Sequence, residues 1–132
     1  WPDELLSQDL PNARMLSFSY DSAARRGATQ GRWSLPQAGK ALVDTLMEVD
    51  VGKHERPVVF VAHSLGGLVV KQACVELSKQ AAYGLRAEQR EAAGRLLSSI
   101  KGAVFYGTAH VGSRLADWLA STGIELVPAL KT

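Results

Sequence analysis

Apolar residues form three short runs in this chain, and each run predicts a β-strand. Residues 13–20 carry a large apolar residue at every second position, which is typical of a strand near the edge of a sheet. Residues 57–62 and 102–106 are continuously apolar, as in parallel strands that are covered on both faces. We therefore expect the three strands to lie parallel in one sheet.

A helix is predicted to begin at Ser34, after a loop over residues 21–33 that is rich in Gly, Ser and Arg. Ser34 and Gln37 form an S-x-x-Q capping box, and Pro36 occupies the first turn, where its missing N–H costs nothing. Apolar residues follow at helical spacing, and Gly52 is a suitable end to the segment.

Further helices are predicted over residues 65–83, with Gly84 at the end, over residues 85–99, and in a short segment near Ser113. Strands that alternate with helices in this way indicate a parallel sheet with right-handed crossovers. The predicted fold class is α/β, with a mostly parallel sheet and helices on both faces.

The sequence AHSLGG, directly after the second strand, matches the small-x-Ser-x-Gly nucleophile elbow, with Ala62 in place of the usual first glycine. The turn brings strand and helix backbones together, so Ala62 and Gly66, two residues on either side of Ser64, must be small. Ser64 is the predicted nucleophile, and the backbone N–H of Leu65 is the predicted oxyanion donor. The alternative is that Ser64 only caps a helix in an unrelated fold.

The remaining elbow residues, His63 and Gly67, are interpreted as structural. The segment after the third strand, GTAHVGS, predicts a loop that borders the same cleft through Thr108 and His110. His110 is a candidate base, but elbow families place the acid and the histidine after a further strand, so a loop-shaping role is favoured.

Three other residues with chemical potential receive ordinary interpretations. His54 is expected in a solvated loop, Cys74 in the core, and Asp117 on the surface. The single cysteine excludes an internal disulfide, which suits a reducing compartment. Nothing has the spacing of metal ligands or of a phosphate-binding loop, so no cofactor or metal is expected.

Length and charge limit the classes of function further. The 132 residues suit one domain, and a net charge of +2 is too small to indicate binding to nucleic acid. No apolar run reaches the roughly 18 residues that a membrane-spanning helix needs. The oligomeric state is left open by the sequence.

The segments RPVVFVAHSLGGLVVKQA and GAVFYGTAHVGSRLADWL, with WPDELLSQDLPNARMLSFSYDS before them, resemble the serine-active-site lipase-like α/β-hydrolases. Fungal hydrolase domains that continue into nucleotide-binding or repeat regions are the alternative family. One departure is Ala109, where the family loop has proline. The resemblance implies that residues 1–132 are a single, incomplete α/β-hydrolase domain. The upstream oxyanion loop and the downstream acid and histidine would then lie outside them.

The predicted function is a serine esterase or lipase that acts through an acyl-enzyme on Ser64. The residues themselves indicate only an ester or thioester. The resemblance implies a lipid ester as substrate and a role in phospholipid remodelling. It also implies a location at mitochondria or the endoplasmic reticulum, and without it the expected location is the cytoplasm. Any membrane association would come from other parts of the protein. Two alternatives remain open: an acyltransferase that passes the acyl group to a lipid alcohol, and a non-catalytic interaction module.

Overall fold

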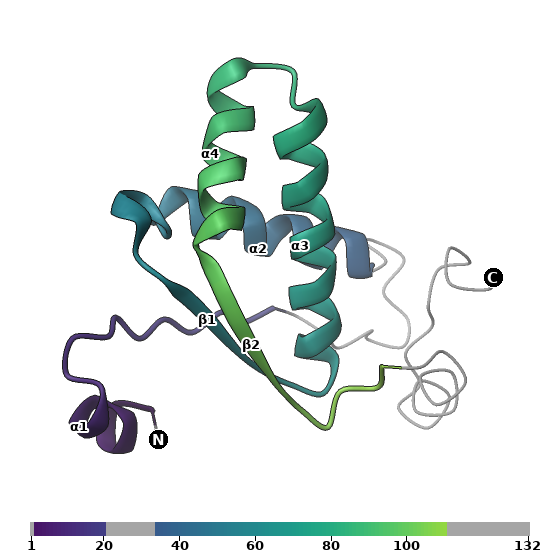
Figure 1. Cartoon of the computed structure of the whole chain (residues 1–132). Coiled ribbons are helices and arrows are strands. Elements are labelled where there is room, and N and C mark those ends of the chain that lie inside the picture. The colour runs from purple at the N-terminus through teal and green to yellow at the C-terminus, as the bar shows by residue number, and fades with distance from the viewer. Residues whose placement is uncertain (1, 21–33, 111–132) are drawn as a thin grey trace.

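The computed structural model describes residues 2–20 and 34–110, and their order of helices and strands is that of an α/β fold. The main elements, shown in Figure 1, are α2 (Leu35–Glu48), β1 (Val58–His63), α3 (Leu65–Tyr83), α4 (Ala87–Ser99) and β2 (Ile100–Tyr106). Three short helical turns complete the order: η1 (Pro2–Leu6), α1 (Ser7–Asp9) and η2 (Lys53–Glu55). The predicted loop at 21–33 and the predicted helix near Ser113 lie outside the described residues.

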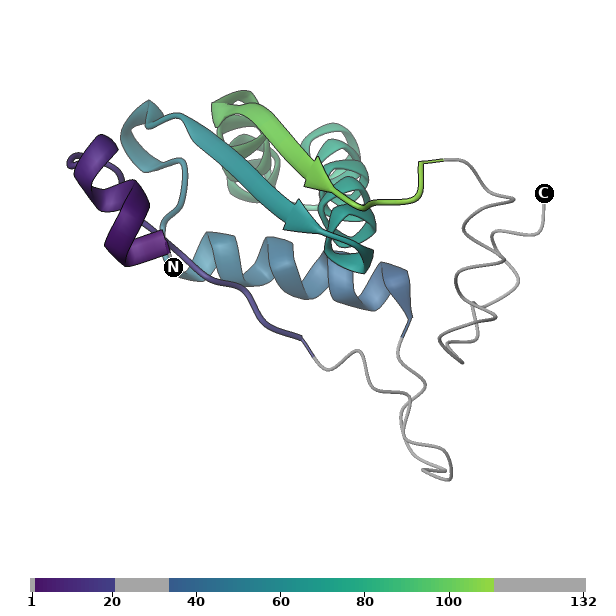
Figure 2. The ribbon, with the colours of Figure 1, turned by 90° about the horizontal axis from the view of Figure 1, so that it is seen from below.

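Strands β1 and β2 pair in parallel, as predicted for the two continuous apolar runs. Ala62 lies opposite Phe105, and His63 lies opposite Tyr106. The two strands therefore end together, as Figure 2 shows, and the residues that follow them begin at the same edge of the sheet. Helices α3 and α4 make the crossover between the strands.

The prediction that residues 13–20 form a third strand is wrong, because the sheet in the described ranges contains only β1 and β2. The segment is held by side chains instead. Phe18 and Tyr20 pack against the core, and the Arg14 guanidinium donates to the carbonyl of Val49 at 3.2 Å. Alternating apolar residues need only one buried face, which an extended segment can have without joining a sheet.

The two faces of the sheet differ in how well they are covered. Phe60 and Phe105 pack against the helices on one face, where Ala62 is only 7% exposed. On the other face, Val59 and Val61 are 59% and 57% exposed. The prediction of helices on both faces is therefore wrong for the part of the chain that the structure describes. The continuous apolar runs indicated that both faces of the sheet are covered, but nothing in residues 2–20 and 34–110 covers the second face.

Helices α2, α3 and α4 pack together to form the core. The largest fully buried side chains are Val43, Val69, Leu77 and Leu96. At the crossing of α2 and α3, a Cβ on Gly39 would lie 2.5 Å from Cγ of Gln72 and 3.0 Å from its backbone carbonyl carbon. Glycine is therefore required there for the two helices to approach each other. This contact fixes the position of α3, which begins at the predicted elbow.

The predicted start of α2 is confirmed. Ser34 has an extended backbone, and its hydroxyl accepts a hydrogen bond from the backbone N–H of Gln37 at 3.3 Å. The predicted helix over residues 65–83 is also confirmed, whereas α4 begins at Ala87, two residues later than predicted.

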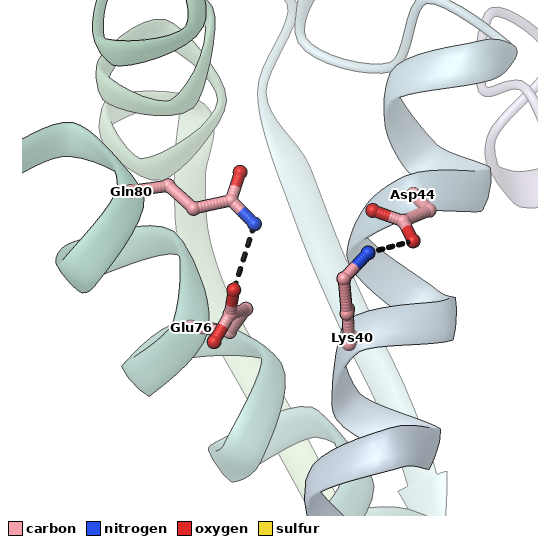
Figure 3. A network of polar contacts seen from close by, with 4 residues as sticks. All are labelled: Lys40, Asp44, Glu76 and Gln80. Carbon is pink, nitrogen blue, oxygen red and sulfur yellow. Dashed lines mark hydrogen bonds and ion pairs between the residues drawn. The ribbon is translucent and has the colours of Figure 1, made fainter. Parts of the chain in front are cut away.

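Polar side chains flank the crossing of α2 and α3, as Figure 3 shows. Lys40 pairs with Asp44 on α2, and Gln80 donates to Glu76 on α3 at 2.8 Å. The hydrogen bond and the charge of Asp44, with a smaller effect from Glu76, raise the pKa of Lys40. Because Lys40 and Asp44 are exposed, their pairing adds little to stability, and it marks the solvated border of the core.

Candidate active site at the strand-to-helix turn

Ser64 joins the end of β1 directly to the start of α3, and its backbone is strained. Its φ is 52° and its ψ is −123°, a conformation that residues with a side chain rarely adopt. Such a conformation costs on the order of 1–3 kcal/mol and persists only where the surrounding structure enforces it. A strained serine between a parallel strand and a helix matches the geometry of the nucleophile elbow.

The hydroxyl of Ser64 does not cap α3, because it makes no hydrogen bond to the backbone of the first turn. A capping serine normally has an extended backbone and accepts from an N–H two or three residues later. The alternative interpretation of Ser64 as an ordinary helix cap is therefore wrong. Its hydroxyl is available for another role.

Leu65 is the first residue of α3, so its N–H has no acceptor within the helix. Helix dipoles and unsatisfied N–H groups make this end of a helix favourable for negative charge. The side chain of Leu65 is buried at 5% exposure, which fixes the residue in the core while its N–H stays at the turn. This N–H can serve as one donor to an oxyanion that forms on a group bound to Ser64.

The last residue of β2 and the loop after it bind both backbone groups of Ser64. The N–H of Ser64 donates to the carbonyl of Tyr106 at 2.8 Å. The carbonyl of Ser64 accepts from the hydroxyl of Thr108 at 3.1 Å and from the N–H of Gly67 at 3.1 Å. The predicted loop residue Thr108 therefore lies in contact with the elbow, although it is 44 residues away in the sequence.

Close packing at the elbow falls on Gly67 rather than on Gly66. A Cβ on Gly67 would lie 2.1 Å from the hydroxyl oxygen of Thr108 and 2.9 Å from the ring of Phe105. A Cβ on Gly66 would meet only the hydroxyl of Tyr20, at 3.8 Å. Alanine, which is the small residue at position 62, would therefore also fit at position 66, and the prediction that Gly66 must be small stays a prediction for larger side chains. Gly67 is the position at the elbow where only glycine fits.

The two histidines near the elbow have different surroundings. His63 is exposed at the end of β1, beside Gly107. His110 is also exposed, and its Nδ1 accepts from Nζ of Lys71 at 2.7 Å, because an ammonium can only donate. Within the described ranges, neither histidine is hydrogen-bonded to Ser64.

Phe105 connects Lys71 and His110. Its ring lies 5.6 Å from Nζ of Lys71 and meets the imidazole edge-on, with 5.4 Å between ring centroids. Sequence reasoning missed Lys71, because its position on α3 gives no sign of the loop that it contacts. The sequence offers only its spacing as a clue: Lys71 lies seven residues after Ser64, two helical turns along α3, and therefore on the same side of the helix as the elbow.

The remaining candidates lie away from this turn or outside the described residues. His54 is exposed in η2, as expected, and Asp117 is outside the described ranges. Cys74 is half-buried on α3, and burial raises the pKa of its thiol. In residues 2–20 and 34–110, no group of three or more His, Cys, Asp or Glu is placed to hold a metal ion. The helices of those same residues include none that is long and apolar enough to span a bilayer.

Comparison with known proteins gives one consistent result. The chain is 31% identical to Protein SERAC1 of Mus musculus and 32% identical to that of Bos taurus, each over 134 residues. It is 32% identical to Protein SERAC1 of Danio rerio over 136 residues. Each alignment covers 99% of this chain and 19% of the relative, so the chain spans about a fifth of the length of the curated relatives it matches.

No family model matches the chain, and no solved structure matches it. Each relative named above is Protein SERAC1, which supports a relationship to that protein and gives no support to the fungal alternative.

Proposed function

We propose that Ser64 is the nucleophile of an acyl-transfer reaction on an ester, in a domain of the α/β-hydrolase type. The observation that carries this proposal is the conformation of Ser64. Its backbone has a positive φ, and its hydroxyl is not used to cap the helix that it begins. A strained backbone conformation, at a residue whose side chain does not cap the helix, is typical of catalytic residues.

The reaction follows from the groups at the turn. A general base takes the proton of the Ser64 hydroxyl as its oxygen attacks the ester carbonyl. The carbonyl oxygen becomes an oxyanion, which the N–H of Leu65 and a second donor stabilise. Collapse of this intermediate reforms the carbonyl, and the alcohol leaves with the proton from the base. Water then attacks the acyl-enzyme in the same way and releases the acid.

In the described ranges, no side chain that could act as the base is hydrogen-bonded to the hydroxyl of Ser64. A hydroxyl without a positioned base is a poor nucleophile. The proposal therefore includes a histidine elsewhere in the protein.

The substrate class is the finer part of the proposal. The resemblance of the two motifs to lipase-like hydrolases supports a lipid ester, and with it a role in phospholipid remodelling at mitochondria or the endoplasmic reticulum. A lipid alcohol in place of water would turn the same acyl-enzyme into an acyltransferase.

A fluorophosphonate probe tests the proposal, because it reacts only with activated serines. The probe should label the longest natural protein that carries these residues, and digestion should place the label on Ser64. Ser64→Ala should abolish the label. Ser78→Ala, which removes an exposed serine from the same helix, should leave it unchanged. A folded protein that is never labelled would favour the non-catalytic module instead. Equal labelling after Ser64→Ala would show that the reactive serine is a different residue, and it would overturn the assignment of Ser64.

A further inference from the structure

We propose that Thr108 is a positioning residue that aims the oxyanion donor at the nucleophile. The inference rests on the proposed function of Ser64. It assigns to the loop after β2 a specific task, which is to fix the peptide unit between Ser64 and Leu65.

The peptide unit between Ser64 and Leu65 is planar. In a trans peptide the carbonyl oxygen and the following N–H point in opposite directions in one plane. A group that holds the carbonyl of Ser64 therefore also sets the direction of the N–H of Leu65. The Thr108 hydroxyl donates to this carbonyl at 3.1 Å, from a partly buried position.

A second donor to the same carbonyl makes the orientation specific. The N–H of Gly67 reaches it at 3.1 Å from within α3, whereas Thr108 reaches it from the loop after β2. One hydrogen bond alone would let the peptide plane rotate about the contact. Two donors from different elements hold the plane, and with it the N–H of Leu65.

Thr108 itself is held in place by its surroundings. The N–H of Ser64 donates to the carbonyl of Tyr106, only two residues earlier. Gly107, between Tyr106 and Thr108, has a φ of +58°, which turns the chain so that the threonine faces the elbow. The absence of a side chain at Gly67 makes the space that Thr108 fills, since a Cβ there would lie 2.1 Å from the hydroxyl oxygen and 2.6 Å from the methyl carbon.

The size of the expected effect follows from this indirect role. Removing an oxyanion donor itself typically costs about 10²–10³ in rate. Thr108 acts through the donor rather than on the oxyanion, so its loss should cost less, about tenfold. The hydroxyl should matter more than the methyl group.

The experiment compares Thr108→Val, which keeps the shape and loses the hydroxyl, with Thr108→Ser, which keeps the hydroxyl. Thr108→Ala is a second variant without the hydroxyl, in case valine prevents folding. In the full-length protein we expect about a tenfold slower fluorophosphonate labelling of Ser64 for the valine and alanine variants. We expect near wild-type labelling for the serine variant. With a p-nitrophenyl ester, kcat should fall and KM should stay unchanged.

Two outcomes would overturn the proposal. One is a wild-type labelling rate in a folded protein that lacks the hydroxyl. The other is equal slowing by serine and valine, which would assign Thr108 to packing alone.

If the wild-type protein shows no labelling that depends on Ser64, the proposed function fails, and the positioning role is then decided separately. Backbone NMR of Thr108→Val should shift the amide signal of Leu65 while the amide of Leu97, on α4, stays fixed. An unchanged Leu65 signal would show that Thr108 does not hold this peptide.

Discussion

Helices α2 and α3 each follow directly after a serine, and the two serines have opposite roles. Ser34, before α2, has an extended backbone with a φ of −130°, and its hydroxyl binds the N–H of Gln37. Ser64, before α3, has a φ of 52°, and its hydroxyl binds nothing in its helix. At the same position before a helix, one serine therefore has a relaxed backbone and caps the helix with its hydroxyl. The other has a strained backbone, and its hydroxyl does not cap the helix.

The difference shows where the conformation of each serine comes from. The conformation of Ser34 is stabilised locally, by the hydrogen bond from the N–H of Gln37, three residues later in the sequence. The backbone of Ser64 has one local hydrogen bond, from the N–H of Gly67, but it is also bonded to the carbonyl of Tyr106 and the hydroxyl of Thr108, more than forty residues away. A helix start can thus be read as a candidate site when its polar side chain is not used for capping and distant elements enforce its backbone.

The largest expected effect separates the two serines by activity. Ser64→Ala should remove labelling by fluorophosphonate, since loss of a nucleophilic serine costs about 10⁶ in kcat in a serine protease. Ser34→Ala should label at the wild-type rate. Loss of labelling in a folded Ser34→Ala protein would show that the two helix starts are not functionally distinct.

The next effect tests the distant contacts that hold Ser64. Gly67→Ala should destabilise the protein by about 1–3 kcal/mol, because the added carbon overlaps Thr108 and Phe105. Gly66→Ala is the matched control, and it should be neutral or stabilising by up to about 1 kcal/mol, because alanine favours helix. Urea unfolding measures both, and equal effects of the two changes would contradict the packing described for the elbow.

A smaller effect concerns the cap of α2. Ser34→Ala should lower the free energy of unfolding by about 1 kcal/mol, because the N–H of Gln37 loses its acceptor. Ser64→Ala should change it by much less, since no cap is lost. Chemical denaturation of both variants gives the comparison, and a larger loss at Ser64 would reveal a structural role for its hydroxyl.

The smallest effect is a gain in stability. Ser64→Gly should stabilise the fold by up to about 1 kcal/mol, because glycine adopts a positive φ without steric cost. Ser34→Gly should instead cost a few tenths of a kcal/mol. A thermal melt in which Ser64→Gly is less stable than the wild type would argue that the turn is not strained.

Much of this fold could be predicted because it depends on nearby residues. The spacing of apolar positions and the sequence around Ser34 located α2, and the same reasoning located α3, β1 and β2. Pattern alone failed at residues 13–20, because an alternating segment looks the same whether it pairs in a sheet or packs on one face. It also could not show that the second face of β1 is uncovered in the described ranges.

The candidate site was predictable only in part, for the same reason. The motif identified Ser64 and Leu65 from their neighbours. It did not show that Gly67 must be glycine, because the atom that excludes a side chain there belongs to Thr108, far along the sequence. Gly39 was missed likewise, since its requirement comes from Gln72 on another helix.

The distance in sequence between Ser64 and Thr108 has a consequence for folding. Helix α2 can acquire its cap as soon as its own first turn forms. The elbow cannot be complete until β2 has docked beside β1 and closed a loop of more than forty residues, and contacts of this separation form late and slowly. During synthesis, Ser64 leaves the ribosome well before the segment that shapes it. Ser64 therefore acquires its strained geometry only after much of this domain has been assembled.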